Sequence, residues 1–358
     1  MTRPGEVQLA PVLPNHRLDE DALLRYLQKN LPGFRGPTQM RQFVGGQSNP
    51  TYHLQTPERA YVLRKKPAGK LLPSAHAVDR EFALLRALQG SVVPVPHAHL
   101  LCEDESVLGQ VFYVMDHVDG RIFTDRLLPG CSREDRSAMY DDMNRVLAAL
   151  HQVDWRAVGL ADFGRPEQYA ARQINRWSRQ YRETKVIELE AMDRLLEWLP
   201  AHLPNGEEAA VAHGDFRIGN LIFHPTEPRV VAVLDWELAT IGHPFADLAY
   251  CCLGYRLPPL NGRGFGDADL RALGIPGEAE FLQRYCHRTG RDDIPHWEFY
   301  IVLSLFRTAA ILVGVHRRAL QGNANAGGAL SSQEIYQVIA ERAWSIAQSV
   351  DAGAVAPS

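Results

Sequence analysis

HGDFRIGN at residues 213–220, followed by VVAVLDWE at residues 230–237, is the part of the sequence that most restricts which folds the chain can adopt. Asp215 and Asn220 are five positions apart, and Asp235 lies fifteen residues further on, where an apolar run predicts the end of a buried strand. Phosphoryl transfer needs one carboxylate to orient the attacking hydroxyl and further oxygen atoms to hold Mg²⁺ on the phosphates. The spacing therefore predicts Asp215 as the catalytic residue, and Asn220 and Asp235 as Mg²⁺ ligands.

The same residues have a simpler interpretation, in which Asp215 and Asn220 only turn a loop and Asp235 only caps the helix that follows. For an isolated Asp and Asn at this spacing, that interpretation would be preferred. The order of His213, Gly214, the flanking apolar runs and Asp235 favours the catalytic interpretation, because protein kinases space the Asp and Asn of their catalytic loop in the same way. We interpret His213 as a residue that braces the loop.

Short alternating segments precede this motif, and helical patterns surround it. The predicted strands are residues 41–44, 51–55, 60–65, 98–101 and 110–115, with a helix at 77–89. The predicted later elements are helices at 132–153, 169–181, 188–199 and from 279 onward, short strands at 211, 221–223 and 230–234, and loops at 257–266 and 322–332.

These patterns predict an α+β fold with two lobes, a small antiparallel-sheet N-lobe and a larger, mostly helical C-lobe. The predicted division is an N-terminal helical extension at residues 1–37, the N-lobe with its hinge at 38–118, and the C-lobe at 119–358. Asp19 is expected to cap the helix of the extension.

Composition excludes several classes of function. The chain has 358 residues, 46% of them hydrophobic and 22% charged, and its net charge of −4 gives no basic surface for nucleic acid. Five cysteines without CxxC spacing favour reduced thiols and a cytoplasmic setting. The N-terminus lacks the apolar run of a signal peptide, and the apolar run at residues 309–315 is too short to span a membrane.

Four segments together resemble a known family. They are GGQSNPTY at 45–52, YVLRKKP at 61–67, LLPSAHAVDRE at 71–81 and HGDFRIGNLIFHP at 213–225. Over roughly residues 38–320 the chain resembles the aminoglycoside phosphotransferase family, the small-molecule branch of the protein-kinase-like fold. Within it, the chain is most similar to the kinase-like domain that is fused to acyl-CoA dehydrogenases in some larger proteins.

The resemblance implies an ATP site between the lobes. Its phosphate-covering loop would consist of Gly45, Gly46, Gln47, Ser48 and Asn49, although these residues alone would read as a hairpin turn. On the third strand, Val62 would line the adenine pocket and Arg64 would contact the phosphates, where the family more often has lysine. Lys65 and Lys66 remain alternatives for that contact, and Glu81 would form an ion pair with the cation.

The run VFYVMDHVDG at 111–120 is similar to a kinase hinge. By this resemblance Met115 is the gatekeeper, and the carbonyl of Asp116 and the amide of Val118 face the edge of adenine. The usual DFG motif is replaced by Asp235, Trp236 and Glu237, and no APE motif follows. These departures favour a small-molecule kinase over a protein kinase. Asp247 resembles a second family Asp, which braces the catalytic loop.

A basic helix face suggests the kind of acceptor. Arg172, Arg176 and Arg179 are spaced to lie on one face of a helix, within a chain of negative net charge. Such a face attracts an anion, so we expect an anionic small-molecule alcohol, with a hydroxyacyl-CoA as one candidate. The alternative is a solvated charged face.

Other functions remain possible from the sequence. One is an aminoglycoside- or choline-type kinase, and another is a nucleotide-binding scaffold without catalysis. A third is a metal-dependent hydrolase that uses His213, Asp215, His224 and Asp235. The sequence does not distinguish ATP from GTP, identify the acceptor or give the oligomeric state.

Overall fold

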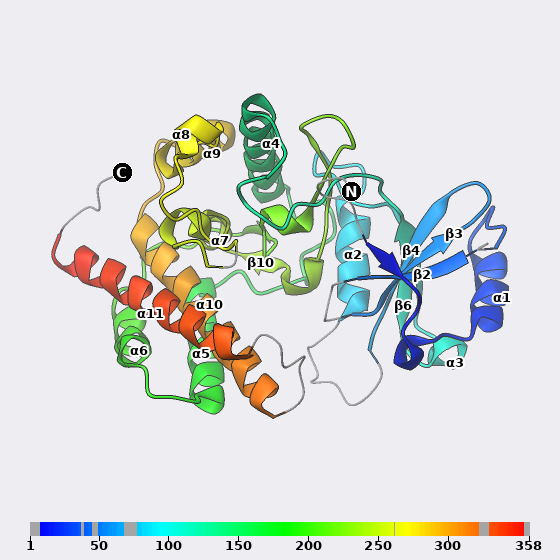
Figure 1. The fold of residues 1–358 in the computed structure, drawn as a ribbon, viewed down its shortest axis with the longest axis horizontal. Coiled ribbons are helices and arrows are strands. Elements are labelled where there is room, and N and C mark those ends of the chain that lie inside the picture. Colours follow the sequence, from blue (N-terminus) through cyan, green and yellow to red (C-terminus); the bar gives the residue numbers. More distant parts are fainter. Residues whose placement is uncertain are drawn as a thin grey trace.

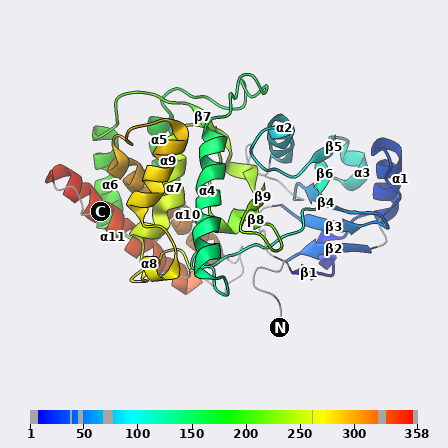
Figure 2. The same cartoon turned by 90° about the horizontal axis from the view of Figure 1, so that it is seen from above.

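A computed structural model describes residues 8–36, 39–44, 49–67, 77–260, 262–321 and 329–353. Two lobes lie side by side along the longest axis of the molecule (Figure 1). The smaller lobe is built on a sheet and the larger one on helices, and Figure 2 shows the same division from above. The predicted α+β class and two-lobed architecture are confirmed.

Six strands form the sheet of the N-lobe, in the order β1-β2-β3-β4-β6-β5, and every neighbouring pair is antiparallel. The strands are β1 (Leu9–Ala10), β2 (Gln39–Phe43), β3 (Thr51–Gln55), β4 (Ala60–Lys65), β5 (Ala98–Cys102) and β6 (Phe112–Asp116). Because successive side chains of a strand point to opposite faces, Val62 and Arg64 of β4 share one face of the sheet. In the register of β4 with β6, Val62 is opposite Met115 and Arg64 is opposite Tyr113.

A helix packs on each face of this sheet. Helix α1 (Glu20–Asn30), capped by Asp19, buries Leu23 and Leu27 against the apolar side chains of one face. On the opposite face lies α2 (Val78–Leu88), whose buried residues include Glu81. The predicted N-terminal extension therefore contributes both its helix and β1 to the N-lobe. A single turn, α3 (Glu105–Leu108), was not predicted.

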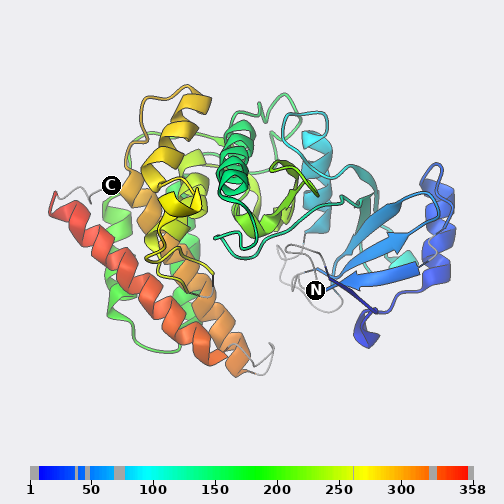
Figure 3. The same ribbon diagram turned by 45° about the horizontal axis from the view of Figure 1, so that its top comes forward.

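The C-lobe is mainly helical. Its helices are α4 (Arg133–His151), α5 (Tyr169–Thr184), α6 (Glu190–Ala201), α7 (Pro244–Arg256), α8 (Leu270–Leu273), α9 (Glu278–Thr289), α10 (Trp297–Leu320) and α11 (Ala329–Asp351). Helices α10 and α11 lie along one another, as the orange and red ribbons of Figure 3 show. Among the described residues, α10 alone has the length and composition to cross a membrane, but 89% of its apolar window is buried inside the fold.

The C-lobe also contains two small two-stranded sheets. One pairs β7 (Ala210–Ala212) with β10 (Thr240–Gly242), and the other pairs β8 (Leu221–Phe223) with β9 (Val230–Val233). The segment that joins β7 to β8 is the HGDFRIGN motif, and β9 leads into Asp235. Both parts of the motif therefore adjoin strands that are held in place by pairing, the first part β7 and β8, the second part β9.

Helix α7 was missing from the sequence-based expectation. Its residues are buried nearly all round, so the segment lacks the one-sided apolar pattern by which a surface helix is recognised. At the C-terminal side, helix α11 starts at Ala329, inside the stretch 322–332 that we expected to be a loop. Residues 322–328 of that stretch lie outside the described residues.

Candidate active site

His213 braces the loop that carries Asp215. Its Nε2 lies 2.9 Å from the carbonyl of Leu234, and its Nδ1 accepts a hydrogen bond of 3.2 Å from the amide of Asp215. An acceptor Nδ1 leaves the ring hydrogen on Nε2, so the ring donates to Leu234 in the neutral tautomer. Both nitrogens are occupied by the backbone, and the ring ties the Asp215 loop to the strand that precedes Asp235.

Asp247, at the start of α7, anchors the same loop from beneath. Its carboxylate accepts hydrogen bonds from the amides of His213 (2.7 Å) and Gly214 (2.8 Å), and lies 3.2 Å from Nε2 of His151. Burial would raise the pKa of the Asp247 carboxyl, but the His151 contact and the His213 amide outweigh burial and lower it. The carboxylate therefore stays ionised and fixes the backbone just before Asp215.

Gly214 has a conformation that few other residues could adopt. Its φ is +81°, and a Cβ at this position would lie 2.7 Å from the carbonyl oxygen of Leu238. The carbonyl of Gly214 accepts a 2.6 Å hydrogen bond from Arg307 of α10. The amide and the carbonyl of Gly214 are thus fixed by hydrogen bonds with Asp247 and Arg307, and its α-carbon packs close to Leu238. This fixes the direction of the Asp215 side chain.

Asp215 and Asn220 are in direct contact. The amide nitrogen Nδ2 of Asn220 donates to both Oδ2 and the carbonyl oxygen of Asp215, each at 2.8 Å. Arg217 Nε donates to the same Oδ2 at 3.2 Å. The two donors approach one carboxylate oxygen, so they orient the carboxylate with its other oxygen, Oδ1, turned away from them.

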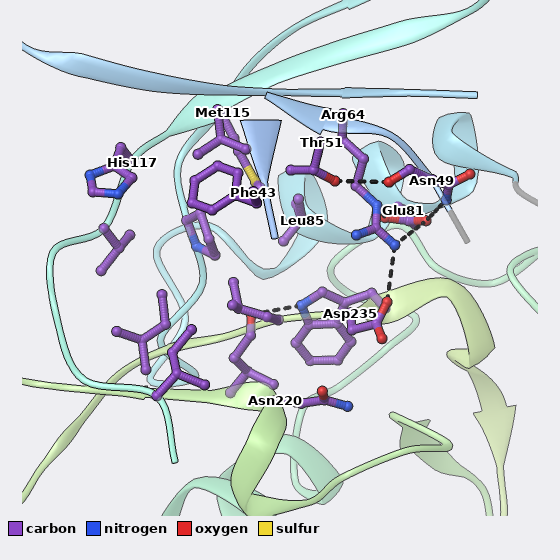
Figure 4. Close-up of a pocket in the computed structure, with 18 of the residues that line it drawn as sticks. Phe43, Asn49, Thr51, Arg64, Glu81, Leu85, Met115, His117, Asn220 and Asp235 are labelled. Atoms are coloured by element: carbon purple, nitrogen blue, oxygen red, sulfur yellow. Dashed lines mark hydrogen bonds and ion pairs between the residues drawn. The ribbon is translucent and has the colours of Figure 1, made fainter. Parts of the chain in front are cut away.

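The N-lobe contributes a buried ion pair. Arg64 Nε lies 2.8 Å from Oε2 of Glu81, and Arg64 Nη2 lies 3.0 Å from Oδ1 of Asp235 (Figure 4). Glu81 also accepts hydrogen bonds of 3.1 Å from the side-chain Nδ2 of Asn49 and from the hydroxyl of Tyr113. Burial raises the pKa of Glu81 to about 7, although Arg64 opposes that shift.

Asp235 has a left-handed backbone conformation, with φ +65° and ψ +61°. Such a conformation costs a residue other than glycine on the order of 1–3 kcal/mol, and it occurs mainly at functional sites. Asp235 is separated from β9 by Leu234 and precedes a short 3₁₀ turn, Trp236–Leu238. The ring of Trp236 lies 4.5 Å from the ring of His213. The strained turn directs the Asp235 carboxylate toward Arg64, into the space between the lobes.

A cavity of about 380 Å³ lies between the lobes, and Figure 4 shows its lining. The predicted residues that line it are Asn49, Val62, Arg64, Glu81, Met115, Asp116, Val118, Asn220 and Asp235. Lys65 and Lys66 are absent from the lining, so among the three candidate cations the structure brings Arg64 to the cavity. Gly45, Gly46, Gln47 and Ser48 lie outside the described residues.

A second cavity, of about 540 Å³, lies among residues of the C-lobe, next to the loop that carries Asp215. Asp215 and Tyr250 line it, together with three arginines and an apolar wall. The arginines are Arg126, Arg217 and Arg263, and the apolar residues are Ile218, Leu253, Leu257, Leu312 and Ile335. The cavity thus combines one carboxylate with several guanidinium groups and aliphatic side chains.

A family model matches residues 39–300 and describes a phosphotransferase enzyme family. The chain belongs to this family. It is 47% identical over 348 residues to mouse acyl-CoA dehydrogenase family member 10. The aligned region covers 96% of this chain but 32% of the mouse protein. The chain thus spans about a third of the length of that relative.

Solved structures agree with the family assignment. A protein of Ralstonia eutropha JMP134, assigned provisionally as an aminoglycoside phosphotransferase, has 45% identity and a TM-score of 0.85 over 93% of this chain and 99% of that one. Spectinomycin phosphotransferase, in complex with ADP and spectinomycin, has 12% identity and a TM-score of 0.62 over 93% and 99% of the two chains. The second similarity concerns the fold alone.

The three arginines that helix spacing predicted at the acceptor site lie outside both cavities. Arg172, Arg176 and Arg179 line neither cavity in the described part of the chain. On α5, Arg176 and Arg179 are exposed, Arg172 donates to the carbonyl of Arg165, and the Arg176 guanidinium lies 5.0 Å from the Trp177 ring. The sequence did not indicate Arg126 and Arg263, because both come from loops without a periodic pattern.

The residues of the hydrolase alternative do not form one metal site. No group of three or more His, Cys, Asp or Glu side chains is arranged to hold a metal ion in the described ranges. His224 accepts a hydrogen bond from the amide of Glu227 in its own turn, and the ring of His213 is bonded to the backbone. Neither histidine is directed at Asp215 and Asp235 as a shared ligand set.

Proposed function

We propose that this family member is an ATP- and Mg²⁺-dependent phosphotransferase that moves the γ-phosphoryl group onto an alcohol of an anionic small molecule. One observation carries the proposal. Asp215 lines the cavity of the C-lobe, whereas its hydrogen-bond partner Asn220 lines the cavity between the lobes. A nucleotide in one cavity and an alcohol in the other would therefore meet at the two residues that phosphoryl transfer requires.

The cavity between the lobes suits a nucleotide. Its hinge side is apolar, with Val62 and Met115 from the sheet and Ile222 from the C-lobe, as a purine ring requires. The amide of Val118 makes no hydrogen bond within the described part of the chain and could donate to the edge of the base. Arg64 lies at the opposite, polar end, where phosphates would be placed. The ADP complex of spectinomycin phosphotransferase, which shares the fold, supports nucleotide binding.

The oxygen ligands that Asn220 and Asp235 offer suit Mg²⁺. Nδ2 of Asn220 is used for Asp215, which leaves the amide oxygen of Asn220 without a donor among the described residues. Asp235 adds a carboxylate that lines the same cavity. Mg²⁺ prefers such hard oxygen ligands and commonly takes one or two from the protein and the rest from phosphates and water. When bound, the ion would neutralise phosphate charge; the protein's own contribution is to hold these two oxygens in place.

The second cavity suits an alcohol that carries a negative charge and an aliphatic part. Asp215 would accept the proton of the attacking hydroxyl, and the backbone bonds to His213 and Asp247 would keep its carboxylate in position. Arg126 and Arg263 would bind a carboxylate or phosphate of the acceptor, while the leucines of the wall would cover its chain. A hydroxyacyl-CoA or a related hydroxy acid has this combination of groups.

The test is a measurement of ADP formation with Mg·ATP and a panel of acceptors. The panel contains hydroxyacyl-CoAs, free hydroxy acids and aminoglycosides, and Asp215→Asn is the matched variant because it preserves shape and removes the charge. We expect acceptor-dependent ADP release with the anionic alcohols and its loss in the variant. Preference for aminoglycosides would return the protein to the antibiotic-kinase alternative, and no release with any acceptor would favour the silent scaffold.

A further inference from the structure

The two cavities share part of their lining. Thr124 and Arg217 are the residues of the described ranges that line both. Arg217 is therefore the cation at the junction, whereas Arg64 lines only the nucleotide side and Arg126 only the acceptor side.

The guanidinium of Arg217 has a built position beside Asp215. Its Nε donates to Oδ2 of Asp215 at 3.2 Å. Gly219 makes room for the rest of the group, because a Cβ on Gly219 would lie 2.3 Å from Nη1 of Arg217. Gly219 has no left-handed backbone conformation to explain a glycine, so the space for the guanidinium is what its missing side chain provides.

The terminal nitrogens of Arg217 are available to a ligand. The hydrogen bond of Nε to Asp215 is the one bond that the Arg217 side chain makes within the described part of the protein. About 40% of the side chain is exposed, whereas Arg64 is 13% exposed and already paired with Glu81 and Asp235. Arg217 thus presents unpaired N–H donors next to the proposed catalytic carboxylate.

We propose that Arg217 is a further catalytic residue, whose guanidinium binds the transferring phosphoryl group and stabilises its charge in the transition state. The inference rests on the proposed function, because it places the nucleotide and the acceptor in the two cavities. The planar fork of N–H groups matches the equatorial oxygens of a phosphoryl group, and an arginine in such a position acts within its own chain, without a partner protein.

The chemical step balances without a covalent role for Arg217. The bond between the γ-phosphorus and the β,γ-bridging oxygen breaks, and its electron pair stays on ADP. A new bond forms between the acceptor oxygen and the γ-phosphorus, and the hydroxyl proton goes to Asp215. Arg217 contributes hydrogen bonds and charge. The hydrogen bond from its Nε to Asp215 fixes the phosphoryl-binding guanidinium relative to the carboxylate that accepts the proton.

Three variants test this role, with a fourth as control. Arg217→Gln removes the charge, Arg217→Lys keeps a charge without the fork, and Gly219→Ala displaces the guanidinium while leaving it in the protein. Arg229→Gln is the matched control, because Arg229 is a surface arginine in the turn between β8 and β9 that pairs with Glu227 and lines neither cavity. Each is assayed for kcat and both KM values, and for binding of ADP with and without aluminium fluoride, which mimics the transferring phosphoryl group.

We expect Arg217→Gln to lower kcat by about 10³-fold or more, the lower end of the range for arginines that stabilise the charge of a transferring phosphoryl group. Arg217→Lys should recover part of that loss, and Gly219→Ala should lower kcat by about 10-fold, the effect of a misplaced group. In Arg217→Gln the aluminium fluoride complex should weaken while ADP alone binds as in the parent, and the control should match the parent throughout.

Equal weakening of ADP and of its aluminium fluoride complex, or a kcat of Arg217→Gln close to that of the parent, would overturn the proposal. Binding of ADP with aluminium fluoride needs no acceptor, so it tests the role of Arg217 independently of the proposed acceptor. A parent without acceptor-dependent ADP release contradicts the proposed function, whereas the role of Arg217 is then still decided by the affinity of the analogue.

Discussion

Arg64 of β4 and Asp235 of the C-lobe form an ion pair of 3.0 Å across the cavity between the lobes. The pair joins a strand of the sheet to the strained turn after β9, and Glu81 of α2 holds Arg64 from its other side at 2.8 Å. The position of α2 is thereby linked to that of the proposed metal ligand. Metal and nucleotide binding would therefore depend on contacts from three separate elements.

Asp235→Asn should abolish Mg²⁺-dependent binding of ATP while the protein stays folded. The amide removes the negative charge that a divalent cation needs, but Arg64 keeps Glu81 as an ionic partner. Isothermal titration with Mg·ATP measures the effect, and circular dichroism checks the fold. Glu237→Gln is the control, because Glu237 is 3.9 Å from Arg64 but does not line the cavity. Parent-like affinity in Asp235→Asn would remove Asp235 from the metal site.

Asp215→Ala should lower kcat by about 10²-fold or more, the usual scale for the loss of a general base. Nucleotide affinity should change little, because Asp215 lines the second cavity and not the one between the lobes. Steady-state kinetics and ATP titration on the same preparation provide both numbers. Near-normal turnover in this variant would show that another group accepts the proton.

The arrangement of the 213–220 loop and Asp235 was predictable because these residues are close in sequence. Asp215, Asn220 and Asp235 lie within one loop and one short hairpin, so their spacing alone brings them together. Strand alternation put Arg64 on the same face as Val62, because β4 is a regular strand within the sheet. The family resemblance was needed to assign that face to the nucleotide, and Lys65 and Lys66 stayed as alternatives until the structure placed Arg64 at the cavity.

The acceptor side could not be predicted in the same way. Tyr250 lies on α7 and Arg263 in the loop that follows it, whereas Arg126 comes from a distant loop that packs on α7 through a 3.3 Å hydrogen bond to the carbonyl of Cys251. Helix α7 itself was missed because it is apolar on all sides. The regular spacing on α5 drew attention to Arg176, yet helical spacing places residues on a face without saying what that face meets.

His243 caps α7 and is expected to make stability depend on pH. Its Nδ1 accepts a 3.2 Å hydrogen bond from the amide of Phe245, so its Nε2 carries the hydrogen and donates to the hydroxyl of Tyr300 at 3.0 Å. Burial lowers the pKa of His243 to about 4; Glu208 opposes this shift, while Arg291 and His151 add to it. A proton on Nδ1 of His243 would replace an acceptor by a donor, so the hydrogen bond from the amide of Phe245 would be lost.

The folded state should lose stability as the pH falls from 6.5 toward 4. In that range the unfolded chain binds a proton at His243 that the folded chain excludes, so unfolding becomes more favourable with acidification. The contribution above pH 6.5 is on the order of 3 kcal/mol, at ~1.4 kcal/mol per pKa unit.

Urea denaturation at pH 7 and pH 5 measures the effect. His243→Asn can still cap the helix but does not titrate, so its difference between the two pH values should be smaller than that of the parent by about 2 kcal/mol. The exposed His287 provides the control variant His287→Asn, which should keep the parent's pH dependence. An unchanged pH dependence in His243→Asn would mean that other groups govern acid unfolding.

The last prediction distinguishes two locations for the charge of the acceptor. Arg176 represents the exposed face of α5, and Arg263 represents the cavity that Asp215 lines. If the acceptor anion binds in the cavity, Arg263→Gln removes a charge-assisted contact worth roughly 1.5–3 kcal/mol. The KM of the acceptor should then rise by about tenfold or more, at ~1.4 kcal/mol per decade, while the KM of ATP stays constant.

Arg176→Gln is the matched variant in the same assay, and it should leave the acceptor KM within about threefold of the parent, because no charge-assisted contact is lost. The reverse pattern would move the acceptor to α5, where the arginine spacing first suggested it. A neutral alcohol of similar length sharpens the comparison, since Arg263→Gln should not affect its KM. Equal effects of Arg263→Gln on charged and neutral acceptors would indicate that Arg263 shapes the cavity wall and does not bind the anion.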